Sequence, residues 1–110
     1  MKVEEKGHTI TIRDTLGDSE AFLEKVFNEY KSFEKHNLIL DISHDKNVTQ
    51  KTISIFIPLS KMHRKGKKSF VLVTPDVDFN AVPMSVIVVP SLLEAHDIIE
   101  MEEIERDLGF

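Results

Sequence analysis

The sequence contains no cysteine and no tryptophan, and only four of its 110 residues are glycine and four are proline. The absence of cysteine excludes disulfide bonds, thiolate metal sites and cysteine nucleophiles, and it agrees with a reducing compartment. A hydrophobic content of 41% with so few glycines and prolines is typical of an ordered chain. We expect residues 1–110 to form a single domain, because this length encloses one hydrophobic core.

The sequence also lacks a long apolar run. The stretches at residues 55–59 and 86–90 fall far short of the roughly 20 residues that cross a bilayer. The first residues, Met1–Lys6, carry charges without the apolar segment of a secretory signal. These absences predict a cytoplasmic protein without a membrane partner.

Basic residues are outnumbered by acidic ones, and the net charge of −5 makes nucleic acid an unexpected partner. The charges are unevenly placed, with a basic cluster in the middle of the chain and an acidic segment near its C-terminal end. Cations at the end of a helix are favoured by the helix dipole, so the basic cluster needs no phosphate ligand to explain it. The basic cluster consists of Lys61, Arg64, Lys65, Lys67 and Lys68, and the acidic segment contains Glu94, Asp97, Glu100, Glu102, Glu103, Glu105 and Asp107, interrupted by Arg106.

Hydrophobic patterns predict four strands. His8–Arg13 alternates polar and apolar residues, which is typical of a half-buried strand whose start could lie as early as Val3. Nearly continuous apolar runs at Leu38–Ile42, Ser69–Thr74 and Ser85–Val89 predict strands that are buried on both faces. Such strands favour parallel pairing.

Two amphipathic helices are expected. One runs from Ser19 to Lys35 after a cap at Asp18 or Ser19, and Asn37 suits its exit. The other runs from Leu92 to Leu108 after a capping box that begins at Ser91. An apolar stripe of the first helix is predicted to face the sheet and contains Leu23, Val26, Phe27, Tyr30 and Phe33.

The segment Thr49–Lys65 fits both an alternating strand and a helix, so periodicity alone does not decide. We interpret it as a helix that starts near Asn47 and Gln50 and is kinked at Pro58, because parallel strands need a crossover of this length. The predicted order is strand, helix, strand, helix, strand, strand, helix. The fold class is therefore α/β, with a mostly parallel sheet of four to five strands and helices packed on it.

Three segments, Leu38–Ser43, Arg64–Val73 and Val86–Ala95, resemble the STAS family, the sulfate transporter and anti-sigma factor antagonist domain. The family has a buried strand that ends in an aspartate, a basic turn before the next strand, and a last strand followed by a final helix. The resemblance implies one STAS-like domain over residues 1–110. It also implies a non-enzymatic regulatory function through binding of another protein, with a weak homodimer as an open alternative.

The family's functional signature is an Asp-Ser-Ser-Gly segment at the start of the second helix, where a serine accepts phosphate from a kinase. The matching stretch here, Val48–Thr52, lacks the serine and the glycine, which leaves Thr49 and Thr52 as the nearby hydroxyls that could accept phosphate. The resemblance and the position of this loop after a strand predict a partner surface that is extended by Asp14–Asp18. This surface contains His44, Asp45, Lys46, Asn47, Thr49, Gln50, Lys51 and Thr52.

The chain also resembles short bacterial proteins that carry the label ribonuclease Z. That nuclease family needs a His-x-His-x-Asp-His cluster to hold two metal ions, whereas this chain has only Ser43-His44-Asp45-Lys46. We therefore regard the label as misassigned.

Catalytic and cofactor motifs are missing. The sequence has no Gly-x-Ser-x-Gly elbow, no P-loop and no Gly-x-Gly-x-x-Gly turn, and its histidines lack the spacing of metal ligands. We expect no metal, no cofactor and no enzymatic activity, and we expect Asp41 to cap the following loop. The alternative is a small phosphate- or nucleotide-binding or hydrolytic domain that uses the strand-end loop near His44 and Asp45.

Overall fold

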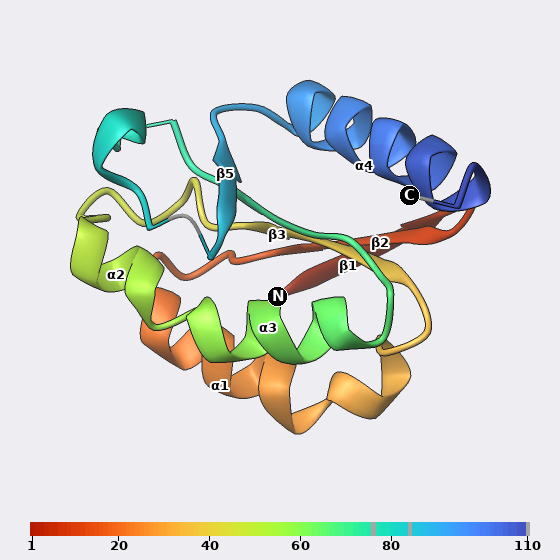
Figure 1. The fold of residues 1–110 in the computed structure, drawn as a ribbon. Helices are drawn as coiled ribbons and strands as arrows, with labels where there is room; N and C mark the ends of the chain where they lie inside the picture. The colour runs from red at the N-terminus through yellow and green to blue at the C-terminus, as the bar shows by residue number, and fades with distance from the viewer. Residues whose placement is uncertain (76, 84, 110) are drawn as a thin grey trace.

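Five strands form one sheet in which every strand lies beside its neighbour in the chain (Figure 1). The computed structural model describes residues 1–75, 77–83 and 85–109. Strand β1 (Lys2–Lys6) pairs antiparallel with β2 (Thr9–Arg13), and the next three strands join in parallel. These are β3 (Asn37–Asp41), β4 (Phe70–Val73) and β5 (Ile87–Val89). The predicted α/β class with a mostly parallel sheet is confirmed.

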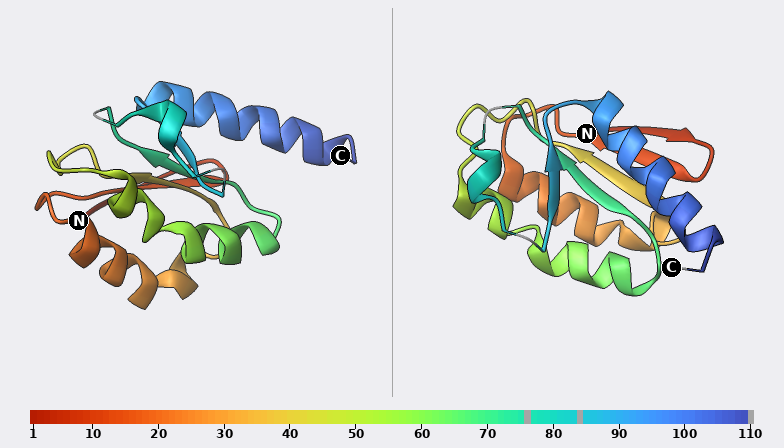
Figure 2. Two further views of the ribbon diagram at one scale, coloured as in Figure 1. Left: turned by 60° about the vertical axis from the view of Figure 1, so that its left-hand side comes forward. Right: turned by 45° about the horizontal axis from the view of Figure 1, so that its top comes forward.

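Helices cover both faces of the sheet (Figure 2). Helices α1 (Ser19–Asn28), α2 (Gln50–Ser54) and α3 (Ile57–Lys65) lie on one face, and α4 (Leu92–Asp107) lies on the other. Right-handed crossovers that advance in the same direction across a parallel sheet place their helices on the same face. The crossovers from β2 to β3 and from β3 to β4 advance in this way, so α1 and α3 lie together. Two short 3₁₀ helices span Tyr30–Ser32 and Phe79–Ala81. No helix in the described ranges has both the length and the apolar character that a membrane span requires.

Two hydrophobic layers hold these elements together. The larger layer lies between the sheet and α1 to α3, where Phe22, Phe56 and Phe70 are almost completely buried. The smaller layer lies under α4, where Ala95 and Ile99 pack with the strand residues of that face. The radius of gyration of the Cα atoms is 12.9 Å, which is close to the value of about 13 Å expected for one domain of this length.

The first helix is shorter than predicted. It ends at Asn28 rather than Lys35, and a 3₁₀ turn continues the chain toward β3. The predicted buried stripe was also partly wrong, because Phe27 is 58% exposed whereas Phe22 and Val26 are buried. Residues with a spacing of three and four around Phe22 and Val26 form the true inner face.

The segment Thr49–Lys65 is helical, as predicted, but it consists of two helices and not one helix kinked at Pro58. The break falls at Ile55 and Phe56, and Pro58 is the second residue of α3. An amide hydrogen has no partner in the first turn of a helix, so proline is tolerated there. The N-cap is Thr49 and not Asn47.

Three other predictions need correction. Asn37 is not a helix exit but the first residue of β3, and its side chain is buried. The chain before β2 forms a separate strand, because Gly7 turns it back with a φ of +59°. β2 is also buried on both faces rather than one, since Thr9 and Thr11 are buried. The C-terminal helix, by contrast, begins after its predicted cap, Ser91, and ends one residue before the predicted Leu108.

Candidate functional site

The predicted partner surface lies at one edge of the sheet. The four parallel strands end at this edge, and the loops that leave them are residues 14–18, 42–49, 74–86 and 90–91. The first two of these loops contain most of the predicted site residues. The start of α2, which contains Gln50, Lys51 and Thr52, follows the second loop directly.

Asp45 connects the first two loops. Its Oδ2 atom accepts hydrogen bonds from the Oγ of Ser19 at 2.7 Å and from the Ser19 amide at 3.3 Å. Its Oδ1 atom accepts from the Asn47 amide at 2.9 Å. Burial acts to raise the pKa of Asp45, but these hydrogen bonds outweigh it and hold the pKa below its usual value. Asp45 therefore anchors the start of α1 and is not a free carboxylate.

The segment 14–18 packs against this loop. Gly17 has a φ of +76°, and a side-chain carbon at its position would lie 3.1 Å from the backbone oxygen of His44. Asp18 caps α1 by accepting a hydrogen bond from the Ala21 amide at 3.1 Å. The structure thus brings residues 14–18 and 44–47 into direct contact.

Asp41 and Arg13 stand side by side where β3 and β2 end. Oδ2 of Asp41 accepts a hydrogen bond from Nε of Arg13 at 3.2 Å, and Oδ1 accepts from the Ser43 amide at 2.9 Å. These contacts are those of an aspartate that caps a loop, as the sequence predicted. No nucleophilic side chain is hydrogen-bonded to Asp41 in the described part of the chain.

Thr49 and Thr52 cap α2 reciprocally. The Thr52 amide donates to Oγ1 of Thr49 at 3.3 Å, and the Thr49 amide donates to Oγ1 of Thr52 at 3.1 Å. Thr49 is exposed, whereas Thr52 is half-buried. The predicted residues that reach solvent most fully are His44, Lys46, Asn47, Thr49, Gln50 and Lys51.

An apolar groove begins beside this edge and was not predicted. It has a volume of about 410 Å³ and runs between α1 and α3. Phe27, which was predicted to belong to the buried stripe, lines this groove and is exposed. The groove is lined by Glu20, Leu23, Glu24, Phe27, Ile55, Pro58, Leu59 and Met62.

The same edge holds two buried polar atoms without a hydrogen-bond partner among the described residues. They are Oδ2 of Asp14, after β2, and Oγ1 of Thr74, after β4. The described strands, however, keep their chain order throughout the sheet. Open α/β sheets form ligand crevices where the order of strands reverses, and this sheet has no such reversal.

The histidines and acidic residues do not gather in the described ranges, where no three of their side chains are placed to share a metal ion. His44 is exposed on the loop, whereas His63 belongs to α3 and is fully buried. Nδ1 of His63 lies 2.6 Å from the Tyr30 hydroxyl, and its Nε2 lies 2.7 Å from the His36 carbonyl oxygen. His63 therefore serves as a buried hydrogen-bonding residue of the core.

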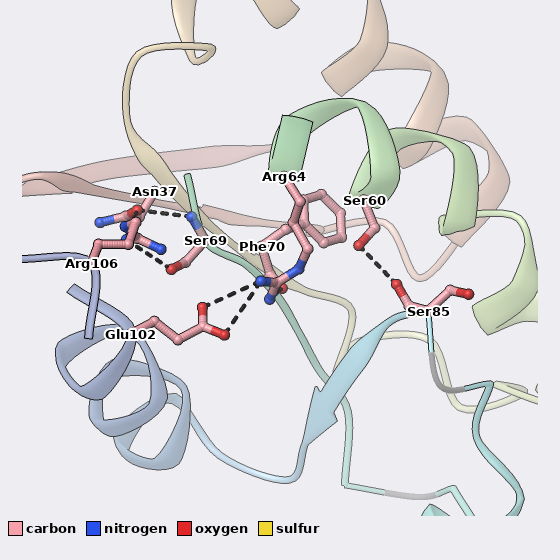
Figure 3. Close-up of polar contacts among 8 residues, drawn as sticks. All are labelled: Asn37, Ser60, Arg64, Ser69, Phe70, Ser85, Glu102 and Arg106. Atoms are coloured by element: carbon pink, nitrogen blue, oxygen red, sulfur yellow. Dashed lines mark hydrogen bonds and ion pairs between the residues drawn. The ribbon is translucent and has the colours of Figure 1, made fainter. Parts of the chain in front are cut away.

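The basic cluster lies at the opposite edge, where α3 ends and β4 begins. Arg64 crosses to α4, with Nη1 lying 3.3 Å from Oε2 of Glu102 and Nη2 donating to the Phe70 carbonyl at 3.1 Å (Figure 3). Arg106 of α4 reaches the same strand end and donates to Asn37 and Ser69. These contacts join α3, β3, β4 and α4.

No family model matches this sequence, and no curated protein is significantly similar to it.

Proposed function

We propose that the protein is a non-enzymatic regulatory module of the cytoplasm, similar to the anti-sigma factor antagonists of the STAS family, and that it binds another protein. The partner surface consists of residues 44–52 together with Asp14–Asp18. The observation that carries the proposal is the pair of hydrogen bonds from Ser19 to Asp45, which holds two polar loops together at one edge of the sheet.

The composition of this edge supports protein binding. Lys46, Asn47, Gln50 and Lys51 are exposed and offer donors and acceptors to a partner. The apolar groove between α1 and α3 starts at the first turn of α1, next to this polar surface. An apolar region beside polar residues is the usual composition of a protein interface.

Phosphorylation is proposed as a means of control at Thr49, with Thr52 as the second acceptor. Thr49 is exposed, so its hydroxyl is accessible to a kinase, whereas Thr52 is half-buried in the reciprocal cap. A phosphate on Thr49 would add negative charge next to Lys51 and at the start of a helix, where the dipole favours it. Such a change alters the surface without disturbing the core.

The test measures binding of the partner that copurifies with the native chain. Gln50→Glu and Lys51→Glu place negative charges on the proposed surface, and we expect each to weaken binding by about tenfold, which corresponds to about 1.4 kcal/mol. Two control variants change exposed sites away from this surface. Lys65→Glu makes the same charge change as Lys51→Glu but at the C-terminal end of α3, and Glu100→Lys reverses a charge on α4. Loss of binding in these two controls, with normal binding by the first two variants, would place the interface elsewhere.

The second candidate is a small phosphate- or nucleotide-binding or hydrolytic domain at the same edge. It is favoured by the buried and unpaired oxygen atoms of Asp14 and Thr74, because the hydroxyl or amino groups of a nucleotide could donate hydrogen bonds to them. A small molecule retained by the native protein, detected by mass spectrometry and lost in Asp14→Asn, would support this candidate. Protein binding that survives in Asp14→Asn but fails in Lys51→Glu would support the first.

A further inference from the structure

Four cations from two distant parts of the chain surround one hollow at the opposite edge of the sheet. The hollow has a volume of about 410 Å³ and is lined by Arg64 from the end of α3, Lys67 and Lys68 from the following turn, Arg106 from the end of α4, and Gly109. The sequence separates Arg106 from the other three by 38 residues or more. We propose that this hollow binds a phosphate group carried by a small molecule.

The two arginines are held in place by the protein itself. Arg64 contacts Glu102 and the Phe70 carbonyl, and Arg106 donates to Asn37 and Ser69 (Figure 3). Each guanidinium carries five N–H donors, so these contacts leave donors free for a ligand. A planar guanidinium that is already oriented binds phosphate with two parallel hydrogen bonds and little loss of side-chain entropy.

The two lysines are not explained by the fold. Neither Lys67 nor Lys68 forms an ion pair with another described residue. Both lie beyond the end of α3, so the dipole of that helix, which acts within the last turn, accounts for Arg64 better than for them. Glu102 compensates the charge of Arg64, but the other cations around the hollow repel one another, and a bound dianion lowers that repulsion.

Lys67 carries the second observation. It is the one residue other than glycine with a positive φ in the described chain, at 61°. This conformation costs a residue with a side chain about 1–2 kcal/mol, and glycine is the usual residue where a helix ends in it. A lysine at this position directs its side chain to the hollow at a cost in stability, which is typical of functional positions.

The hollow lies away from the proposed partner surface. It forms where α3 and α4 end, whereas the partner surface forms where α1 and α2 begin. The proposal therefore stands whether or not the protein partner is found. The positive charge of the hollow also sets it apart from the rest of the protein, which carries a net charge of −5 and repels anions elsewhere.

The experiment follows amide shifts of the ¹⁵N-labelled full chain by NMR while glycerol 3-phosphate is added in 150 mM sodium chloride. We expect saturable shifts confined to residues 64–70 and 106–109. Lys67→Gln with Lys68→Gln should weaken binding at least about tenfold, because two charge-assisted contacts are lost. Lys61→Gln with Lys65→Gln removes the same charge from exposed sites of the same cluster and should leave binding within about twofold.

Parallel titrations separate the possible sources of phosphate. Inorganic phosphate and sulfate test whether a free anion suffices, and vesicles that contain phosphatidic acid test a lipid headgroup. Equal binding of sulfate and glycerol 3-phosphate would reduce the hollow to a general anion site and overturn the proposal. So would equal weakening in the two double variants, or an absence of shifts at 10 mM ligand.

Discussion

Asp45 and Ser19 lie 26 residues apart in the chain, yet the carboxylate of Asp45 and the hydroxyl of Ser19 form a 2.7 Å hydrogen bond. This contact ties the loop after β3 to the start of the helix that follows β2. The polar edge that we propose as a partner surface depends on it, because no other side-chain hydrogen bond joins the two loops among the described residues. The local rigidity of the edge therefore depends on a half-buried carboxylate remaining ionised.

Asp45→Ala should lower the free energy of unfolding by about 1–2 kcal/mol, because two hydrogen bonds to Ser19 and one to Asn47 are lost. The lowered pKa of Asp45 means that its contribution is complete above a pH of about 4, the pKa in the unfolded chain, and is lost as the pH falls through the folded-state pKa. Urea unfolding at pH 7 measures the effect. His44→Ala, which changes the exposed neighbour, should leave stability within about 0.5 kcal/mol, and equal losses in both variants would contradict the role of Asp45.

His63 predicts a second dependence on pH. Its Nε2 donates to the His36 carbonyl, and in the neutral ring, which a lowered pKa favours, its Nδ1 accepts from the Tyr30 hydroxyl. Burial lowers the pKa of His63, the contact with His36 opposes this, and the charges of Arg64 and Lys68 lower it further. The unfolded chain binds a proton at a pH of about 6.5, so stability should be complete above that value and fall as the pH decreases toward the folded-state pKa.

The measurement is urea unfolding between pH 8 and pH 5.5. Removing the titrating group in His63→Gln should flatten the decline in stability, while His44→Gln, at an exposed site, should keep it. If stability falls with pH equally in His63→Gln and in the native chain, groups other than His63 cause the fall.

The sequence predicted the parallel sheet because three of its strands are short and nearly continuous apolar runs. Leu38 to Leu40 and Val71 to Val73 are completely or almost completely buried, as such runs require. The helical pattern was less decisive, because residues at the border of a helical face satisfy the same spacing as buried ones. Phe22 of α1 is buried in the larger core layer, whereas Phe27 lines the groove between α1 and α3 and is exposed.

Contacts between distant residues were beyond prediction. Asn37 follows a helix and suits a helix end by type, yet its Oδ1 atom accepts a hydrogen bond from the Ser69 amide at 2.9 Å and from Arg106 at 3.3 Å. The predicted kink at Pro58 was wrong, because the break lies before it at Ile55 and Phe56, and proline at the start of a helix has the same local pattern as proline at a kink. The phosphate hollow likewise depends on Arg106, which the sequence places in an acidic segment.

Lys67→Gly should stabilise the protein by about 0.5–1 kcal/mol, because glycine adopts a φ of 61° without the clash of a side chain. The same change should weaken binding of glycerol 3-phosphate, since it removes one cation from the hollow. Thermal unfolding and the NMR titration measure the two effects. A variant that gains stability and keeps full affinity would show that Lys67 does not contact the ligand.

Gly17→Ala tests whether contact between the two loops is needed for the proposed partner surface. A Cβ atom at residue 17 would meet the His44 backbone oxygen at 3.1 Å, and the φ of +76° disfavours any side chain, so the junction of the two loops must shift. Gly7→Ala is the matched control, because Gly7 has a φ of +59° but no atom within 4 Å of its added Cβ. Both variants should lose about 1 kcal/mol of stability through backbone strain. Only Gly17→Ala should also weaken binding of the copurifying partner, since only that residue touches the neighbouring loop. If both variants bind the partner as tightly as the native chain at a temperature where both are folded, the junction of the two loops is not part of the interface.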